Sequence, residues 1–297
     1  MDTIRAILLM ILSMALLAGT DTFIKLATAT ASIGQTLLGL TIGGTLLFLA
    51  LARIRRVPIF TRDALLPMIM LRNLFEIIAA VGMVVGVANT ALPVFAAIIQ
   101  AGPLIVTMGA ALFLKEEVGP RRWAAVIVGL TGMMVVIRPW DASFTGWELF
   151  AVLGIAALSA RDLITRLSPP HITALSISTW GFAATLLPGI VLLAIADRPL
   201  VTDAKTLGYI FGAVLVTTSG YLAITTAMRL APASVVSPFR YTRLIFATIL
   251  SIVVFDVWPD GWTLLGGAMI LGAGLYSFLR ERRLAREALA APVAANG

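Results

Sequence analysis

The chain has 297 residues, of which 60% are hydrophobic and only 12% are charged, and its mean hydropathy is +1.00. A water-soluble domain cannot bury that much apolar surface, so most of the chain must face lipid. Because the sequence contains no cysteine, disulfides, thiolate metal sites and thiol nucleophiles are excluded.

Apolar runs of about 20 residues, the length that crosses a bilayer, follow one another along the whole chain. Gly, Pro and charged residues separate them into ten predicted spans. In chain order these cover residues 5–27, 32–51, 65–88, 91–114, 122–138, 147–167, 172–195, 207–228, 232–255 and 261–279. The joints are too short for a soluble domain. The sequence therefore predicts an all-α polytopic membrane protein, a bundle of ten transmembrane helices.

Basic residues gather in alternate joints between these spans, as in RIRR after the second span and RERR after the tenth. The opposite joints carry mainly acidic residues. Because joints rich in Lys and Arg stay in the cytoplasm, we expect both termini there. The net charge of +7 then reflects topology, and we expect the lipid bilayer rather than a nucleic acid as the partner.

The sequence repeats itself at half its length. Asp21 in LAGTDTFIKL and Asp162 in LSARDLITRL lie 141 residues apart. Four more matches share a shift of 139: Pro93 with Pro232, Glu117 with Asp256, Pro120 with Pro259, and Trp123 with Trp262. Spans one to five thus map onto spans six to ten.

Because five is odd, the two halves enter the membrane from opposite sides, an arrangement common among secondary transporters. We expect two inverted five-helix repeats, at residues 1–140 and 141–280, and a cytoplasmic tail at residues 281–297. The match with span six also predicts that the first span is retained rather than cleaved as a signal peptide.

Each repeated aspartate precedes a cation by four residues, Lys25 after Asp21 and Arg166 after Asp162, which places each pair on one helix face. We predict that Asp21 and Asp162 are coupling or gating residues near opposite mouths of the bundle. The alternative is that each pair only makes a polar helix end tolerable in the membrane.

The halves differ most where charges lie inside a span. Span three contains Arg72, Asn73 and Glu76, and span nine contains Arg240 and Arg243. A charge at this depth costs about 2.5–3.5 kcal/mol on insertion scales, so such residues usually face an interior or a wet cavity.

Two interpretations of these charges stay open. Arg72 and Glu76 either neutralise each other at i and i+4, or Glu76 carries a proton that couples transport. Arg240 and Arg243 either pair with Glu76 or Asp162, or donate hydrogen bonds to substrate oxygens.

Two spans also carry an internal proline, Pro103 just after Gln100 and Pro238 just before Tyr241. Broken helices at matching positions in two halves point to a transporter site. The predicted substrate-binding residues are therefore Arg72, Asn73, Gln100, Tyr221, Arg240, Tyr241 and Arg243. We expect Trp180 and Phe182 to be packing aromatics rather than stacking partners of a flat substrate.

The sequence contains no HExxH, P-loop or aspartate-rich diphosphate motif, and His171 is its only histidine. We therefore expect no enzyme activity, no metal site and no cofactor.

The turn LKEEVGPRRW (114–123) and the following GLTGMMVVIRP (129–139) resemble the EamA-type repeat of the drug/metabolite transporter superfamily. The second copy is degenerate, with FDVWPDGW in place of the acid-rich turn. The resemblance implies ten helices in two inverted repeats around a central cavity, lined by spans one, three, four, six, eight and nine.

Three segments, IMLRNLFE, ARDLITR and SPFRYTRLIFA, are similar to those of proteobacterial vitamin and metabolite carriers, among them riboflavin importers and S-adenosylmethionine exchangers. The resemblance implies a secondary transporter of the bacterial inner membrane that works by alternating access, with riboflavin as the first expected substrate. An amino-acid or S-adenosylmethionine exporter or exchanger is the alternative. A channel-like pore, a membrane-embedded enzyme and a homodimer also remain open.

Overall fold

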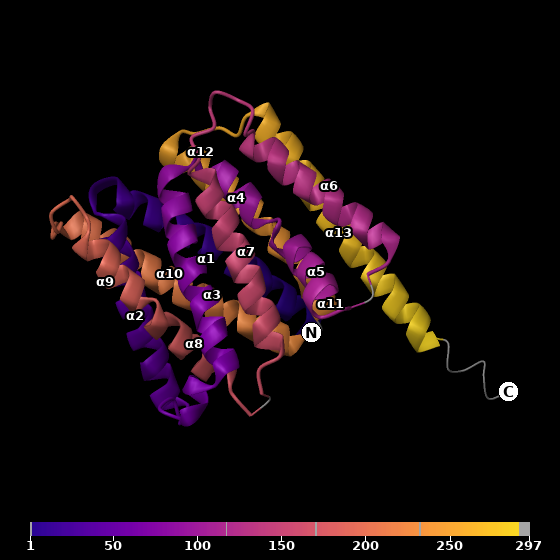
Figure 1. Cartoon of the computed structure of the whole chain (residues 1–297), viewed down its shortest axis with the longest axis horizontal. Coiled ribbons are helices and arrows are strands. Elements are labelled where there is room, and N and C mark those ends of the chain that lie inside the picture. Colours follow the sequence, from indigo (N-terminus) through magenta and orange to yellow (C-terminus); the bar gives the residue numbers. More distant parts are fainter. Residues whose placement is uncertain (1, 117, 170, 232, 291–297) are drawn as a thin grey trace.

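The computed structural model describes residues 2–116, 118–169, 171–231 and 233–290, and helices make up most of them (Figure 1). The helices are α1 (Asp2–Thr30), α2 (Ile33–Ile54), α3 (Pro67–Asn89), α4 (Leu92–Ile99), α5 (Gly102–Phe113), α6 (Pro120–Ile137), α7 (Glu148–Arg166), α8 (Ala174–Ala184), α9 (Leu186–Ala194), α10 (Ala204–Leu230), α11 (Ala233–Val236), α12 (Thr242–Phe255) and α13 (Gly261–Ala290). Two short 3-10 helices, η1 (Arg62–Leu65) and η2 (Ser237–Tyr241), complete the set.

Nine helical stretches within the described residues are long and apolar enough to cross a membrane, and they match nine of the ten predicted spans. The remaining span corresponds to α7, which has 19 residues but also contains four charged ones, at positions 148, 161, 162 and 166. Large apolar side chains such as Leu46, Phe113 and Val253 are exposed on the outside of the bundle. An apolar surface of this extent fits a protein that lies in lipid.

Both predicted helix breaks are present. Span four divides into α4 and α5 at Gln100 and Ala101, because Pro103 has no amide proton to continue the helical ladder. Span nine divides into α11, η2 and α12 around Pro238. A third break, at Thr185 between α8 and α9, was not predicted and lies three residues before Pro188.

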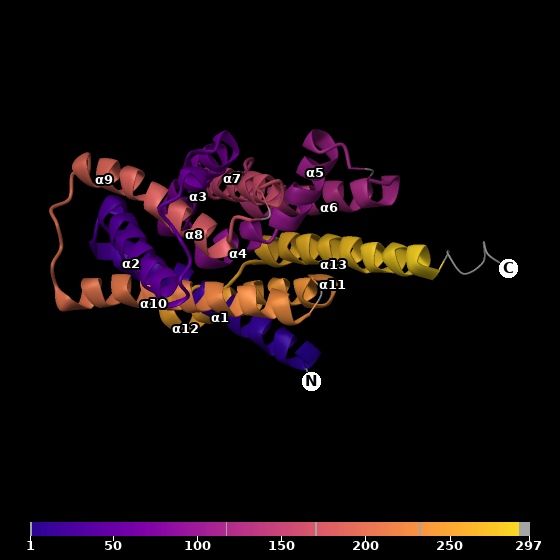
Figure 2. The same cartoon turned by 90° about the horizontal axis from the view of Figure 1, so that it is seen from below.

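The helices form two layers, most clearly separated in Figure 2. One layer contains α3, α4, α5 and α6 together with α7, and the other contains α10, α11, α12 and α13 together with α1. Each layer therefore combines spans three to five of one repeat with the first span of the other repeat. The pairing is symmetric, since α1 packs on α10 as α7 packs on α3.

Glycines allow close contact where the two repeats meet. A β-carbon on Gly82 of α3 would lie 2.8 Å from the Cα of Gly154 in α7. Gly132 of α6 and Gly266 of α13 face each other in the same way, because small residues let helices approach closely in a membrane. Figure 1 shows α6 and α13 side by side along their length.

The last helix runs further than expected. α13 continues to Ala290, ten residues into the segment predicted as a tail. The sequence RERRLAREALA is composed of strong helix formers, which explains the extension.

Candidate functional site

Charged side chains meet inside the first layer, between α3 and α7. Arg72 and Glu76 form an ion pair one turn apart on α3, as the spacing predicts. Arg72 also donates to the amide oxygen of Asn73, at 2.9 Å. Gly181 of α8 packs so closely against this pair that a β-carbon there would collide with the Arg72 guanidinium.

Arg161 of α7 binds the same carboxylate from the other side. Its Nη1 lies 3.3 Å from Oε1 and 3.1 Å from Oε2 of Glu76, and its Nε lies 3.0 Å from Oδ1 of Asp162. One guanidinium therefore joins two acids and two helices. Our sequence analysis missed Arg161, although it directly precedes Asp162 in the repeated segment.

A second ion pair lies in the other layer, between α1 and α12. Arg243 Nη2 donates to both carboxylate oxygens of Asp21, at 2.9 Å and 2.7 Å. Only 6% of the Asp21 side chain and 14% of the Arg243 side chain are exposed. Arg243 therefore pairs with Asp21, and the predicted pairing with Glu76 or Asp162 is wrong. That Arg243 also donates to substrate oxygens stays a prediction.

The two repeated aspartates do not pair with the cations four residues after them. Lys25 does not pair with Asp21 and instead donates to the carbonyl oxygens of Val87 and Thr90 at the end of α3, at 3.1 Å and 2.6 Å. The partial negative charge of a helix C-terminus favours a cation there. In the second half Asp162 binds Arg161 rather than Arg166.

Arg240 lies at the break in span nine and is the unpaired cation of the site. Within the part of the chain that the structure describes, no carboxylate forms an ion pair with its guanidinium, and the residue is exposed. It lies three residues before Arg243, the partner of Asp21, and we group it with these charged residues as one charged region. The alternative that Arg240 pairs with Glu76 or Asp162 is therefore wrong in this structure.

Gln100 connects the two helix breaks. Its side-chain amide donates to the carbonyl oxygen of Arg240, at 3.3 Å. This bond crosses from one layer to the other and joins the two points where proline interrupts a span. The predicted residues Gln100 and Arg240 are thus brought together at the interface of the layers.

Tyr221 lies on α10 among aromatic residues. Its hydroxyl pairs with Ser178 of α8, and its ring stands edge-on to Phe48, with the ring centroids 5.2 Å apart. Phe182 packs on Phe48 as well, with a centroid distance of 5.1 Å.

Trp180 and Tyr241 have packing roles in this structure. The Trp180 indole donates to the carbonyl oxygen of Ile59 at 2.8 Å, so the expectation of a packing aromatic is confirmed. The Tyr241 hydroxyl lies against Gly274 of α13, where no β-carbon would fit.

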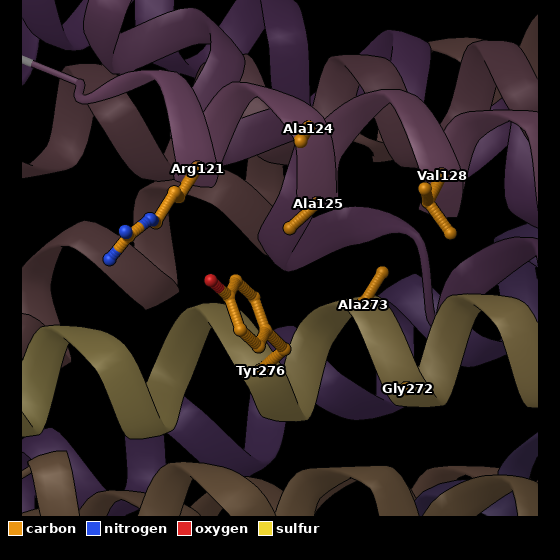
Figure 3. A pocket seen from close by; sticks show the side chains of 7 residues that line it. All are labelled: Arg121, Ala124, Ala125, Val128, Gly272, Ala273 and Tyr276. Carbon is orange, nitrogen blue, oxygen red and sulfur yellow. The ribbon is translucent and has the colours of Figure 1, made fainter.

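Two hollows in the described part of the chain lie away from these residues. A groove of about 320 Å³ between α6 and α13 is lined by small residues with Arg121 and Tyr276 at one end (Figure 3). A second hollow, of about 260 Å³, lies between the ends of α3 and α6 and the start of α7. Neither includes a predicted site residue, and we base the site on the charged region because its polar groups converge there.

The sequence matches the EamA-like transporter family twice, over residues 4–138 and 145–279. The chain belongs to this family. It is therefore a multi-pass transporter of the bacterial inner membrane that moves a small molecule, and not an enzyme.

Several relatives of this EamA-like transporter have named substrates. A riboflavin transporter of Rhizobium johnstonii is 34% identical over 215 residues, which is 71% of this chain and 70% of the relative. A riboflavin transporter of Vibrio cholerae is 28% identical over 59% of this chain and 58% of its own. An S-adenosylmethionine uptake transporter of Rickettsia felis is 25% identical over 61% of each chain.

The fold of the EamA-like transporter is also found in a solved structure, described only as "Crystal structure of protein". It covers 95% of this chain and 97% of its own, with a TM-score of 0.59 and 17% sequence identity. This likeness supports the helical architecture described above.

Proposed function

We propose that this EamA-like transporter takes up riboflavin by alternating access, and that Arg240 binds the substrate. The observation that carries the proposal is that Arg240, at the interface of the layers, forms no ion pair within the described residues, whereas Arg72, Arg161 and Arg243 already pair with acids. The riboflavin transporters among its relatives support the same substrate.

The chemistry of riboflavin suits these groups. Its flat ring system carries two carbonyl oxygens and its ribityl chain carries hydroxyls, and it has no net charge at neutral pH. A guanidinium presents five N–H donors in one plane, which suits carbonyl oxygens. Gln100 supplies an amide at Arg240, and Tyr221 of α10 supplies an aromatic ring.

S-adenosylmethionine is the second candidate, because relatives with that name are also similar. Its carboxylate would suit Arg240, but its sulfonium and ammonium groups are cationic. The charged region holds four arginines, Arg72, Arg161, Arg240 and Arg243, against three acids, Asp21, Glu76 and Asp162. This excess of positive charge favours the neutral vitamin.

Uptake of labelled riboflavin by a bacterium that can neither make nor import the vitamin tests the proposal. We expect saturable uptake only when the protein is present, and competition by unlabelled riboflavin but not by S-adenosylmethionine or amino acids. Flux that does not saturate would indicate a channel-like pore. No uptake by cells whose membranes contain the protein would refute the vitamin as substrate.

The packing of equivalent positions supports alternating access. Asp162 is 38% exposed in its side chain, whereas its repeat equivalent Asp21 is 6% exposed. Arg240 is exposed, whereas its equivalent Ala101 is fully buried. From this difference we infer that the mouth beside Asp162 and Arg240 is open and the mouth beside Asp21 and Ala101 is closed. Exchange of the two packings between repeats would then open the opposite side. From the charge distribution, the open mouth is the cytoplasmic one.

The natural absence of cysteine makes this asymmetry measurable. We expect a membrane-impermeant, anionic thiol reagent to label Asp162→Cys in inside-out vesicles, because this position lines the open mouth. It should not label the same variant in right-side-out vesicles. Ala101→Cys, at a buried position, is the control and should stay unlabelled in both. Equal labelling of the two variants, or labelling of Asp162→Cys from the outside alone, would contradict the proposed open side.

Glu76 is the proposed coupling residue. Its carboxylate holds Arg72 of its own helix and Arg161 of α7, so a proton on Glu76 would loosen α3 from α7. We expect Glu76→Gln to transport with a flattened pH dependence, because glutamine cannot gain or lose this proton. The measurement is initial uptake across a pH series, and a pH profile identical to that of the native protein would exclude proton coupling through Glu76.

A further inference from the structure

The groove between α6 and α13 begins where the close contact of these two helices ends. A β-carbon on Gly132 of α6 would lie 2.8 Å from the carbonyl oxygen of Gly266 in α13, so the helices touch there. At Gly272, further along α13, a β-carbon would meet no atom within 4 Å. Gly272 lines the groove of about 320 Å³, whose walls are mostly small apolar residues. The space beside it is therefore open to an apolar occupant.

The two polar side chains that line the groove lie together at one end. Arg121 belongs to the first turn of α6 and Tyr276 to α13, and Figure 3 shows both at the same end of the groove. Arg280 follows one turn after Tyr276, on the same face of α13. We expect this end at the cytoplasmic membrane surface, because basic residues gather in the adjoining joints. The groove then runs from a basic membrane surface into the apolar depth of the bilayer.

Arg121 offers a positive charge that the protein does not neutralise. Its side chain is exposed, and none of the ion pairs among the described residues involves it. The described residues that line the groove include no acid. A lipid phosphate at this end would supply the missing counter-charge, and an acyl chain would cover the apolar walls.

A second copy of the chain and the transported substrate fit this groove less well. In a symmetric dimer the same surface of both copies meets. Such an interface would bring two Arg121 side chains to a groove whose described lining contains no acid. A polar substrate would find one guanidinium and one phenol, both at the same end, and apolar walls along the rest.

We propose that the groove between α6 and α13 binds one anionic phospholipid of the cytoplasmic leaflet. An acyl chain lies along Ala124, Val128 and Gly272, and the headgroup phosphate accepts hydrogen bonds from Arg121 and Tyr276. This site is independent of the proposed substrate, because no residue of the charged region lines the groove. Since α6 and α13 are the last helices of the two EamA-like matches, the lipid binds where the two repeats join.

Native mass spectrometry of the purified full-length protein tests the headgroup contact. The probes are dioleoyl-phosphatidylglycerol and dioleoyl-phosphatidylcholine, which have the same acyl chains and differ in headgroup charge. We expect the native protein to bind the anionic lipid about fivefold or more tightly, the ratio that one arginine at a membrane surface supplies. Arg121→Gln should lose most of this preference. Arg53→Gln removes an exposed arginine at the end of α2 and should keep it.

Gly272→Leu tests the acyl-chain contact in the same titration. The leucine side chain enters open space, so it fills the groove without displacing a neighbour, and both lipids should bind more weakly. Gly208→Leu on α10 is the matched control, because a β-carbon there also meets no atom within 4 Å, and it should bind lipid like the native protein.

Three results would overturn the lipid site. The first is lipid binding by Gly272→Leu equal to that of Gly208→Leu, and the second is an unchanged headgroup preference in Arg121→Gln. The third is a lipid-free dimer that Gly272→Leu dissociates, which would assign the groove to a second copy of the chain. If Gly272→Leu does not fold, the headgroup preference of Arg121→Gln decides, because this exposed residue has no ion pair to lose among the described residues.

Discussion

If Arg240 binds riboflavin as proposed, we expect Arg240→Ala to reduce riboflavin uptake by about 10- to 100-fold in kcat/KM. The substrate would lose hydrogen bonds with a charged group, which are worth about 1.5–3 kcal/mol. The residue has no ion pair to lose in the described structure, so its removal leaves no buried acid without a partner. The amount of protein in the membrane should therefore stay close to native. The measurement is the initial rate of labelled riboflavin uptake at several concentrations, normalised to membrane protein.

Two comparison variants sharpen this result. Arg240→Lys keeps the charge but not the planar set of donors, and we expect uptake between that of the native protein and that of the alanine variant. Arg53→Ala removes an exposed arginine at the end of α2 and should transport normally. Native kinetics in Arg240→Ala would remove this residue from the binding site and leave the proposed function without its main support.

Asp21→Ala strongly destabilises the folded protein. It leaves the Arg243 guanidinium, only 14% exposed, without its carboxylate partner. Breaking a buried pair by removing one member typically costs about 3–5 kcal/mol, since the remaining charge is uncompensated. We expect a clear fall in the thermal unfolding midpoint of the purified protein, measured in one fixed detergent.

The repeat equivalent Asp162 provides the control for this prediction. Its side chain is 38% exposed and its partner Arg161 also binds Glu76, so Asp162→Ala should cost about 1 kcal/mol or less. Combining Asp21→Ala with Arg243→Leu should recover stability, because the unpaired charge is gone. Equal destabilisation by Asp21→Ala and Asp162→Ala would show that the Asp21–Arg243 ion pair does not stabilise the protein more than the exposed pair does.

The overall fold was largely predictable because lipid imposes simple rules on the sequence. Apolar length set the spans, and prolines at 103 and 238 marked two helix breaks that the structure contains. The pairing of α1 with α10 and of α7 with α3 agrees with the inverted repeat that the shared register of Asp21 and Asp162 predicts. The break at Thr185 was not predicted, although Pro188 follows it by three residues.

The partners of the charged side chains were harder to predict. Spacing along one helix correctly paired Arg72 with Glu76, but the same rule wrongly paired Asp21 with Lys25. The difference is that Asp21 faces α12 across a layer contact, where Arg243 is available, and Lys25 reaches the carbonyl end of α3. Such choices depend on how helices pack, which residue spacing within one span does not report.

Arg161 illustrates a second limit. Comparison of the repeats aligned acidic residues with each other. The prediction therefore concerned the two aspartates and the cation four residues after each of them. The residue before each aspartate differs between the halves, with threonine at 20 and arginine at 161. That difference was visible in the aligned segments and indicates where the repeats have diverged, but only the contacts of Arg161 with two acids show what it does.

Counterflow in proteoliposomes tests the central claim most directly, because it requires both the proposed substrate and exchange across the membrane. Vesicles that contain the purified protein are loaded with unlabelled riboflavin and diluted into a trace of labelled riboflavin. We predict transient accumulation of label above its equilibrium level, which is absent in vesicles loaded with S-adenosylmethionine and strongly reduced with Arg240→Ala. No overshoot with riboflavin, or an equal overshoot in vesicles loaded with S-adenosylmethionine, would contradict riboflavin transport by alternating access.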